Sequence, residues 1–262
     1  MLAVEVTHSI LELENKGWFK VDRCFDLHLI NRICEEWDNI RPYYESIQRS
    51  KGIFSATKNT THHNIINMPS LLELLEVNPL RNFLQDFFNG PYILNTMGIS
   101  EITYGADTYT QKIHRDVRSF DGACNLWINT LVLLDDFDED NGPTLILGGS
   151  HMMKEKPSAE LFKRDATSVA GSAGDVIVFH GNVWHAAGEN NSRTRRRRAL
   201  TPFFSKPFIK QQLDYAEYFG DSKVELKTEY IKQVLGLNAR VPKCVEDFYQ
   251  PDDLRFYKSD QG

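Results

Sequence analysis

The chain has 262 residues, of which 41% are hydrophobic and 25% charged, with a net charge of −6 and a pI near 5.8. This length suits one domain with a sizeable core. The acidic balance argues against general attraction to nucleic acid or to an anionic membrane, because surfaces that bind phosphate normally carry a basic excess.

The ends of the chain and its cysteines bear on its location. Residues 1–17 have neither a basic segment nor a sustained apolar one, so we predict no signal peptide. No apolar run approaches the roughly 18 residues needed to cross a bilayer. Cys24, Cys34, Cys124 and Cys244 form no CxxC pair. We therefore expect a cytoplasmic protein with reduced thiols, whose oligomeric state the sequence leaves open.

Residues 1–90 are predicted to be mostly helical. The stretch 25–48 has apolar residues at mostly i, i+3, i+4 spacing, which indicates an amphipathic helix. Ser70 is predicted to cap a second helical stretch that runs through residue 88, with Glu73 in the capping-box position. The polar segment 55–69 between the two is predicted to be a loop.

Residues 91–205 have the composition of a β core. Short segments rich in β-branched and aromatic residues are separated there by Gly, Asp, Asn or Ser. We expect strands within the segments 92–105, 108–117, 124–137, 142–149, 174–181 and 197–205.

Residues 206–262 form a helical or irregular tail in this prediction, with helical spacing in 229–237. The chain contains no internal repeat. The order of the segments predicts one domain, residues 1–262, that is mainly β: a sandwich or barrel with flanking α-helices, buttressed by the N-terminal helices.

A candidate metal site begins at His114-Arg115-Asp116. Alternate side chains of a strand share a face, so His114 and Asp116 would project together. A second histidine from another strand would complete a set of two imidazoles and one carboxylate, which is the ligand set of non-haem Fe(II) oxygenases. The His-x-Asp pair alone is a weak signal, because it also arises by chance.

The segment 174–185 offers that second histidine. A turn leads into an apolar strand, followed by His180 and His185. About a dozen residues beyond His185 lies an arginine cluster before the last predicted strand. A guanidinium on that strand can face the same cavity and bind a carboxylate bidentately. Counting from His185 allows either Arg196 or Arg197, and His180 remains an alternative distal ligand.

Together these motifs resemble the phytanoyl-CoA dioxygenase family of double-stranded β-helix oxygenases. The resemblance rests on HRD, on DD-x4-NG-x-T-x4-GSH, and on GD-x3-FHGNVWHAAGENNS followed by RRAL, and it covers roughly residues 90–205. It implies a jelly-roll, cupin-like core that uses Fe(II), 2-oxoglutarate and O2. The implied reaction hydroxylates, or desaturates, epoxidises or rearranges, a small organic substrate and releases succinate and CO2.

The resemblance also assigns roles to residues. It implies that His114, Asp116 and His185 are the iron ligands, which leaves His180 a packing role. The residues expected to bind 2-oxoglutarate are Gln111, Thr144, Arg197 and, from the N-terminal loop, Asn67. Of the two arginines, Arg197 is preferred as the partner of the distal carboxylate, with Thr144 donating a hydrogen bond to the same group.

Three positions depart from the pattern of the family. Gly148 stands where the family commonly has proline, Leu131 where it commonly has tryptophan, and Ala187 where it often has a small hydroxyl residue. The last two lie where cofactor or substrate would pack. They leave the secondary cofactor contacts open.

Asp116 bears on the type of reaction. A halogenase of this class lacks the carboxylate so that halide can bind the iron, so Asp116 favours hydroxylation or a related oxidation. Two other functions stay open: a non-catalytic, cupin-like metal-binding or regulatory protein, and a metal-dependent enzyme that uses no 2-oxoglutarate.

The substrate is not specified by the sequence. His62 and His63, in the polar loop, face either the substrate or solvent. Arg118 and Lys112 are either solvated charges at the rim or contacts for an anionic substrate. A natural product of secondary metabolism, an amino-acid derivative and a lipid-like acid all remain compatible with the chain.

Overall fold

The computed structural model describes residues 6–122, 124–220 and 228–262. The parts of the predicted N-terminal layer, β core and tail that fall on residues 1–5, 123 and 221–227 lie outside the described residues. No helix in the described ranges is long and apolar enough to cross a membrane.

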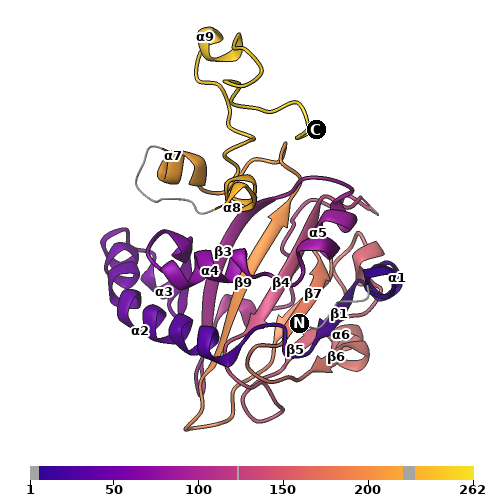
Figure 1. Ribbon diagram of the computed structural model, residues 1–262. Helices are drawn as coiled ribbons and strands as arrows, with labels where there is room; N and C mark the ends of the chain where they lie inside the picture. The colour runs from indigo at the N-terminus through magenta and orange to yellow at the C-terminus, as the bar shows by residue number, and fades with distance from the viewer. Residues whose placement is uncertain (1–5, 123, 221–227) are drawn as a thin grey trace.

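Two antiparallel sheets form the centre of the described chain (Figure 1). The larger sheet has the strand order β1-β7-β4-β9-β3-β2, and the smaller has the order β6-β5-β8. The strands of the larger sheet are β1 (Trp18–Val21), β2 (Thr60–His62), β3 (Ile93–Ile102), β4 (Trp127–Leu133), β7 (Val176–His180) and β9 (Arg197–Ser205). Those of the smaller sheet are β5 (Thr144–Ile146), β6 (Thr167–Val169) and β8 (His185–Ala187). The mainly β architecture confirms the prediction.

Helices from the N-terminal third cover one face of the larger sheet (Figure 1). They are α1 (Val6–Lys16), α2 (Leu27–Ser50), α3 (Phe54–Thr57), α4 (Pro69–Glu76) and α5 (Arg81–Phe88). The side chain of Asp26 caps α2 by accepting a hydrogen bond from the His28 amide at 2.7 Å. The predicted amphipathic helix is therefore present, with its apolar stripe buried against the sheet.

The larger sheet buries apolar side chains on both faces, because its strands alternate between two cores. On β7, Val176 and Val178 join the core under the helices, whereas Ile177 and Phe179 join a second core on the opposite face. Ile146 of the smaller sheet belongs to that second core. The space between the two sheets is thus partly filled by side chains, and the rest of it forms the cavity described below.

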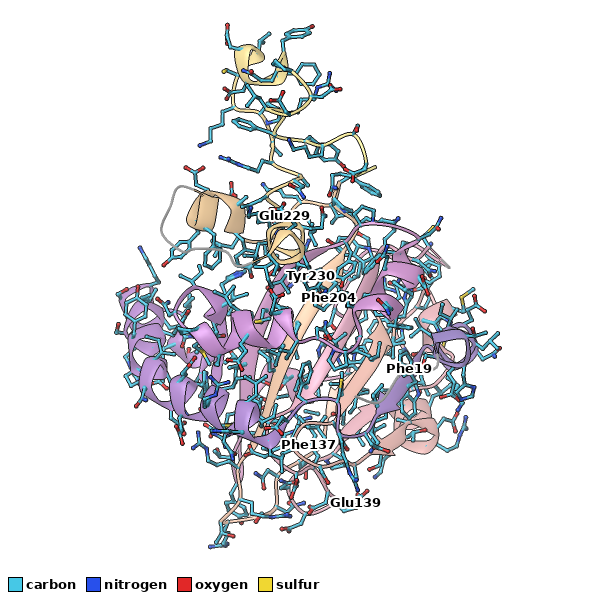
Figure 2. The ribbon with its side chains drawn as sticks, in the orientation of Figure 1. Phe19, Phe137, Glu139, Phe204, Glu229 and Tyr230 are labelled. Carbon is cyan, nitrogen blue, oxygen red and sulfur yellow. The ribbon has the colours of Figure 1, made fainter. Side chains whose placement is uncertain are left out.

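Contacts between aromatic side chains join the C-terminal segment to the end of the larger sheet. Tyr92 packs edge-on against Phe204 at 5.5 Å between ring centroids, and its hydroxyl lies 2.8 Å from that of Tyr230. Tyr230 belongs to α8 (Glu229–Val234), and Figure 2 shows it beside Phe204 at this end of the sheet. The remaining helices are α6 (Ala159–Asp165), α7 (Tyr215–Gly220) and α9 (Val245–Phe248), the last in a segment that projects from the sheets (Figure 1).

Four local predictions in the N-terminal layer are wrong. Ser70 does not cap the second helix: α4 begins at Pro69, whose fixed φ suits the first turn, and the Ser70 hydroxyl donates to Glu36 at 2.6 Å. The helical stretch divides into α4 and α5 around Pro79. The segment predicted as a loop contains the edge strand β2, and β1, at the other edge, lies in a region predicted to be helical.

The segment 108–117 is not a strand. It begins with a turn of 3-10 helix at Tyr109–Gln111, and His114 forms only an isolated bridge to His185. The backbone N–H and C=O groups of His114 and His185 pair with each other, so the two histidines are brought together without a longer strand.

A cluster of charges ties α2 to β3 and β9. Glu101 is 2% exposed and accepts from Arg196 and, at 2.5 Å, from Arg41, while Arg196 also pairs with Asp38. We expect Glu101→Ala to lower the free energy of unfolding by about 2–3 kcal/mol, because it leaves two guanidinium groups without their shared partner while both keep some contact with water. Urea denaturation measures this. Glu229→Ala, which breaks an exposed pair with Lys232, is the control and should cost under about 1 kcal/mol.

Candidate active site

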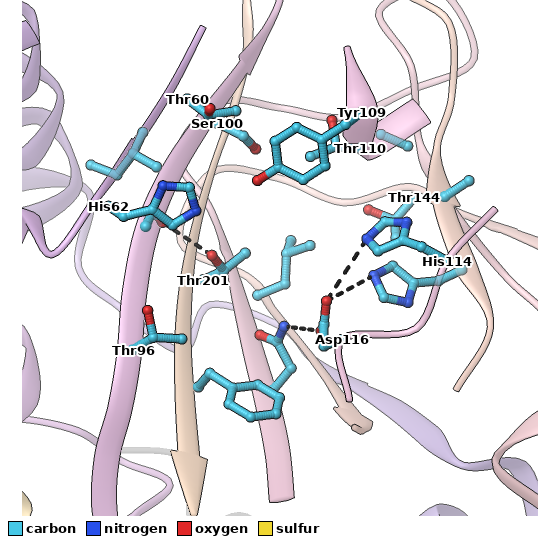
Figure 3. A pocket seen from close by; sticks show the side chains of 18 of the residues that line it. Thr60, His62, Thr96, Ser100, Tyr109, Thr110, His114, Asp116, Thr144 and Thr201 are labelled. Carbon is cyan, nitrogen blue, oxygen red and sulfur yellow. Dashed lines mark hydrogen bonds and ion pairs between the residues drawn. The ribbon is translucent and has the colours of Figure 1, made fainter. Parts of the chain in front are cut away.

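A cavity of about 490 Å³ lies between the two sheets (Figure 3). Side chains of β2, β3, β4, β7 and β9 line it from the larger sheet, and side chains of β5 and β8 from the smaller one. The segment that follows the turn at Tyr109–Gln111 closes part of the rim and contributes His114 and Asp116.

Three potential metal ligands converge in this cavity. One ligand atom from each of His114, Asp116 and His185 can be chosen so that all lie within 4.8 Å of one another. Oδ1 of Asp116 is 3.8 Å from Nε2 of either histidine. The two histidines are held side by side because their backbones exchange N–H···O bonds of 3.0 and 2.9 Å.

Hydrogen bonds to the backbone orient both imidazoles. Nδ1 of His114 donates to the carbonyl of Lys112 at 2.7 Å, and Nδ1 of His185 donates to the carbonyl of Val183 at 3.0 Å. The lone pair of each ring is therefore on Nε2, which faces Asp116. Burial lowers the pKa of His185 below its ordinary value. A neutral imidazole is the form that binds a metal.

The carboxylate is oriented by a residue that sequence reasoning did not single out. Asn129 of β4 donates from Nδ2 to Oδ2 of Asp116 at 2.6 Å, which leaves Oδ1 directed toward the histidines. Asn129 and the buried Leu131 are two residues apart and share the cavity face of β4. The only signal available in the sequence was a polar residue at an inward position of an apolar strand.

A buried arginine faces the same cavity. Arg197 is 2% exposed, donates from Nη2 to Thr144 Oγ1 at 2.9 Å and from Nε to the carbonyl of Gly142 at 3.1 Å, and lies 4.0 Å from the ring centre of Phe137. No Asp or Glu of the described ranges forms an ion pair with it. Burial lowers the pKa of Arg197 to about 9, so the group remains protonated at neutral pH. Such a cation favours an anionic ligand.

The neighbouring arginines precede β9 and pair with acidic side chains outside the cavity. Arg196 pairs with Asp38 and Glu101 on the helix side, and Arg195 pairs with Asp138 at 2.7 Å on the surface. Of the two arginines that the spacing allowed, Arg197 is therefore the one that lines the cavity.

Two residues expected at the cofactor have other partners. Oε1 of Gln111 accepts from the amide of Thr108 at 2.9 Å and so caps the turn that precedes His114. Asn67 donates to the hydroxyl of Tyr44 at 3.1 Å. Neither is among the described residues that line the cavity.

The other histidines considered in the sequence analysis lie in different places. His62 lines the cavity, whereas His63 lies 2.8 Å from the hydroxyl of Tyr215. His180 is not part of the three-residue cluster: it packs near Phe87 and His151 on the far side of β7.

His180 predicts a pH effect on stability. Its Nε2 donates to the Cys124 carbonyl at 3.3 Å and its Nδ1 accepts from the Asn182 amide at 3.2 Å, so the neutral ring is satisfied. Burial lowers the pKa of His180 from 6.5 to about 4. Between these values the unfolded chain binds a proton that the folded chain does not, so the free energy of unfolding falls as the pH falls through this window, by on the order of 3 kcal/mol.

The measurement is chemical denaturation at pH 7 and pH 4.5 of the native chain and of His180→Gln. The native chain should lose more stability than the variant between the two values. Equal losses would mean that His180 does not carry the effect.

The chain is similar to known proteins in sequence and in fold. A family model described as phytanoyl-CoA dioxygenase (PhyH) matches residues 13–199. The uncharacterized protein Rv1501 of Mycobacterium tuberculosis is 35% identical over 156 residues, which are 60% of this chain and 57% of that protein. The dioxygenase cdmA of Talaromyces verruculosus is 31% identical over 153 residues, 56% of this chain and 49% of that protein. The chain thus spans about half the length of these curated relatives.

The fold is similar to that of EctD from S. alaskensis, whose structure was solved with 2-oxoglutarate and 5-hydroxyectoine. The TM-score is 0.60 at 13% identity, and the match covers 78% of this chain and 76% of that one. At this identity the likeness concerns the fold alone. Together with the two antiparallel sheets, it confirms the predicted fold class.

Proposed function

The chain belongs to the phytanoyl-CoA dioxygenase family, and from this premise we propose that it is an Fe(II)- and 2-oxoglutarate-dependent dioxygenase acting on a small organic molecule. Residues 1–262 would act as one oxygenase domain. His114, Asp116 and His185 would hold the iron. The reaction would be a hydroxylation, or a desaturation, epoxidation or rearrangement, with O2 consumed and succinate and CO2 released.

Arg197 is the observation that carries the choice of 2-oxoglutarate. The guanidinium of Arg197 is buried, is hydrogen-bonded to Thr144 and has no acidic partner in the described part of the chain. It faces the cavity that also contains the three ligand atoms. A dicarboxylic keto acid matches both features, because one end can chelate a metal while the far carboxylate accepts hydrogen bonds from Arg197 and Thr144. A ligand without that second carboxylate would leave the buried charge unpaired.

The donor set supports iron. Two imidazole nitrogens and one carboxylate oxygen are the donor set of non-haem Fe(II) oxygenases, and His114, His185 and Asp116 would supply it. The bound iron would supply the oxidising chemistry. The chain would keep His185 neutral, hold Asp116 in place through Asn129, and exclude water with Leu131 and Phe179 on the cavity wall.

The presence of Asp116 supports oxidation over halogenation. Its Oδ1 points at both histidines, so the position that a halide would need is filled by a carboxylate. The hydrogen bond from Asn129 secures this orientation.

Oxygen-dependent decarboxylation of 2-oxoglutarate tests the proposal. Protein reconstituted with Fe(II) and ascorbate should convert 2-oxoglutarate to succinate slowly without a primary substrate, and a chelator should stop it. A non-catalytic, cupin-like metal-binding protein would bind iron and form no succinate. A metal-dependent enzyme of another kind would consume O2 equally well without 2-oxoglutarate.

A further inference from the structure

The cavity wall formed by β2, β3 and β9 carries hydroxyl groups. Thr96, Gly98 and Ser100 occupy alternate positions on β3 and line the cavity, whereas Met97 and Ile99 between them belong to the core under the helices. Figure 3 shows Thr96, with His62 and Thr201, across the pocket from His114 and Thr144. Binding pockets are usually lined mainly by apolar and aromatic side chains, so this wall is unusually polar.

This polar wall, which includes His62, Thr96, Ser100 and Thr201, lies beyond the reach of 2-oxoglutarate. Along β9, Thr201 is four residues from Arg197, a separation of about 13 Å in an extended strand. Thr201 is paired with Gly98, and Gly98 is paired with His62 on β2, so the three form one row across the sheet. A five-carbon diacid anchored on Arg197 and directed at the metal ligands cannot also cover this row. The row therefore faces the substrate.

Several polar groups of the wall lack protein partners. Oγ1 of Thr96 is buried and makes no hydrogen bond. The exposed ring of His62 and the hydroxyl of the half-buried Ser100 also have no hydrogen-bond partner within the described ranges. Thr201 donates to the Gly98 carbonyl at 3.1 Å, which leaves its oxygen free to accept. Buried polar groups are normally hydrogen-bonded, so the unpaired hydroxyl of Thr96 points to a ligand that completes it. The ring of His62 and the hydroxyl of Ser100 face the same cavity and can bind that ligand too.

Glycine at position 98 lets His62 join the wall. A Cβ at this position would lie 2.9 Å from the carbonyl oxygen of Thr61 and 3.1 Å from the His62 ring. Only a residue without a side chain leaves room for the imidazole to lie across β3. Desolvation by the surrounding protein lowers the pKa of His62, so at neutral pH the ring offers one donor and one acceptor.

The charges around the cavity restrict the substrate further. Among its described lining residues Asp116 is the one carboxylate, and the proposed iron would occupy it. Arg115 and Arg118 also line the cavity. A cationic substrate would therefore meet no free acidic group and two like charges, whereas a neutral or acidic one would meet no repulsion.

This inference rests on the proposed function. We infer that the substrate is a small neutral or acidic molecule that bears several hydroxyl or amide groups, and that His62, Thr96 and Ser100 bind these groups on one side of the molecule. A hydrocarbon chain or an apolar polycyclic skeleton would leave these groups desolvated and unpaired. Such a site discriminates strongly against analogues that lack the polar groups.

The test uses matched probes on the complex of the full chain with Fe(II) and 2-oxoglutarate under argon. Gluconate is paired with hexanoate, quinate with cyclohexanecarboxylate, and myo-inositol with cyclohexanol, each at millimolar concentration. Binding is read from the shift of the visible charge-transfer band and, after O2 is admitted, from stimulated succinate release. We expect polar members to bind at least tenfold more tightly than their apolar partners. Binding by apolar members alone, or by no polar member, overturns the inference.

Substitutions that keep side-chain shape identify the wall. Thr96→Val and His62→Phe should each weaken binding of the best polar probe about tenfold and leave the affinity for 2-oxoglutarate unchanged. Thr130→Val is the control, because Thr130 belongs to β4 but bonds to the carbonyl of Pro202 and lies outside the cavity lining. Unchanged polar binding in both wall variants would also overturn the inference. A native chain that gives no band with Fe(II) and 2-oxoglutarate contradicts the proposed function instead.

Discussion

Asp116→Ala is expected to abolish succinate formation from 2-oxoglutarate, with a loss of roughly 1000-fold or more. Loss of contacts around a metal ligand already costs about 10- to 100-fold, and loss of a ligand itself should cost more. The side chain of Asp116 is 24% exposed and lies at the cavity, so its removal leaves no hole in either core. Succinate release and the thermal unfolding midpoint, measured together, separate chemistry from folding.

Asp107→Ala provides the control for this substitution, because Asp107 is an exposed carboxylate outside the cavity lining. It should retain full succinate release. Turnover retained in a folded Asp116→Ala chain would mean that iron is held by other groups, and the ligand assignment would be wrong.

Arg197→Met is expected to raise the KM for 2-oxoglutarate by about 100-fold or more, because the far carboxylate loses its charged partner. The same change should leave the ligand-free protein as stable or make it more stable. Methionine has a similar length, and it removes a buried charge that no acidic side chain of the described ranges pairs with. Initial rates over a range of 2-oxoglutarate concentrations and urea denaturation without ligand measure the two effects.

Arg195→Met is the matched control. Arg195 lies two positions earlier on the chain, and its side chain is 41% exposed and paired with Asp138. Its KM for 2-oxoglutarate should equal that of the native chain. If Arg197→Met also kept the native KM, the far carboxylate would have to bind elsewhere in the cavity.

Spacing alone left His180 and Arg196 open, and the structure shows why His185 and Arg197 are the residues at the cavity. Arg196 precedes β9 and pairs with acidic side chains outside the cavity, and the two-residue period of a strand accounts for the two cores on either side of β7. His185 rather than His180 joins His114 and Asp116 because β7 ends at His180 and a turn precedes β8. Family resemblance had favoured the same two residues.

The features that the sequence did not predict depend on contacts between distant segments. His114 and Asp116 were expected on a strand, but a single bridge to His185 positions them, and no local pattern indicates such a bridge. The bond from Asn129 to Asp116 joins β4 to the cavity rim. The strands β1 and β2 are short, and each is stabilised by one neighbour in the sheet rather than by its own propensity.

The polar wall could not be read from the sequence for a related reason. Thr96 and Ser100 stand in a strand whose other residues are mostly apolar, which is equally typical of a strand with one solvated face. Their role depends on which face the smaller sheet covers. The pairing of β5 with β8, which brings Thr144 opposite Ala187, decides that.

The central claim, that this cavity binds Fe(II) and 2-oxoglutarate together, is tested most directly by anaerobic titration of the purified chain. We predict a weak visible charge-transfer band that requires both components and saturates at one iron per chain. It should be absent in Asp116→Ala and should need far more 2-oxoglutarate in Arg197→Met. A folded chain that binds iron but gives no band at saturating 2-oxoglutarate would contradict the account.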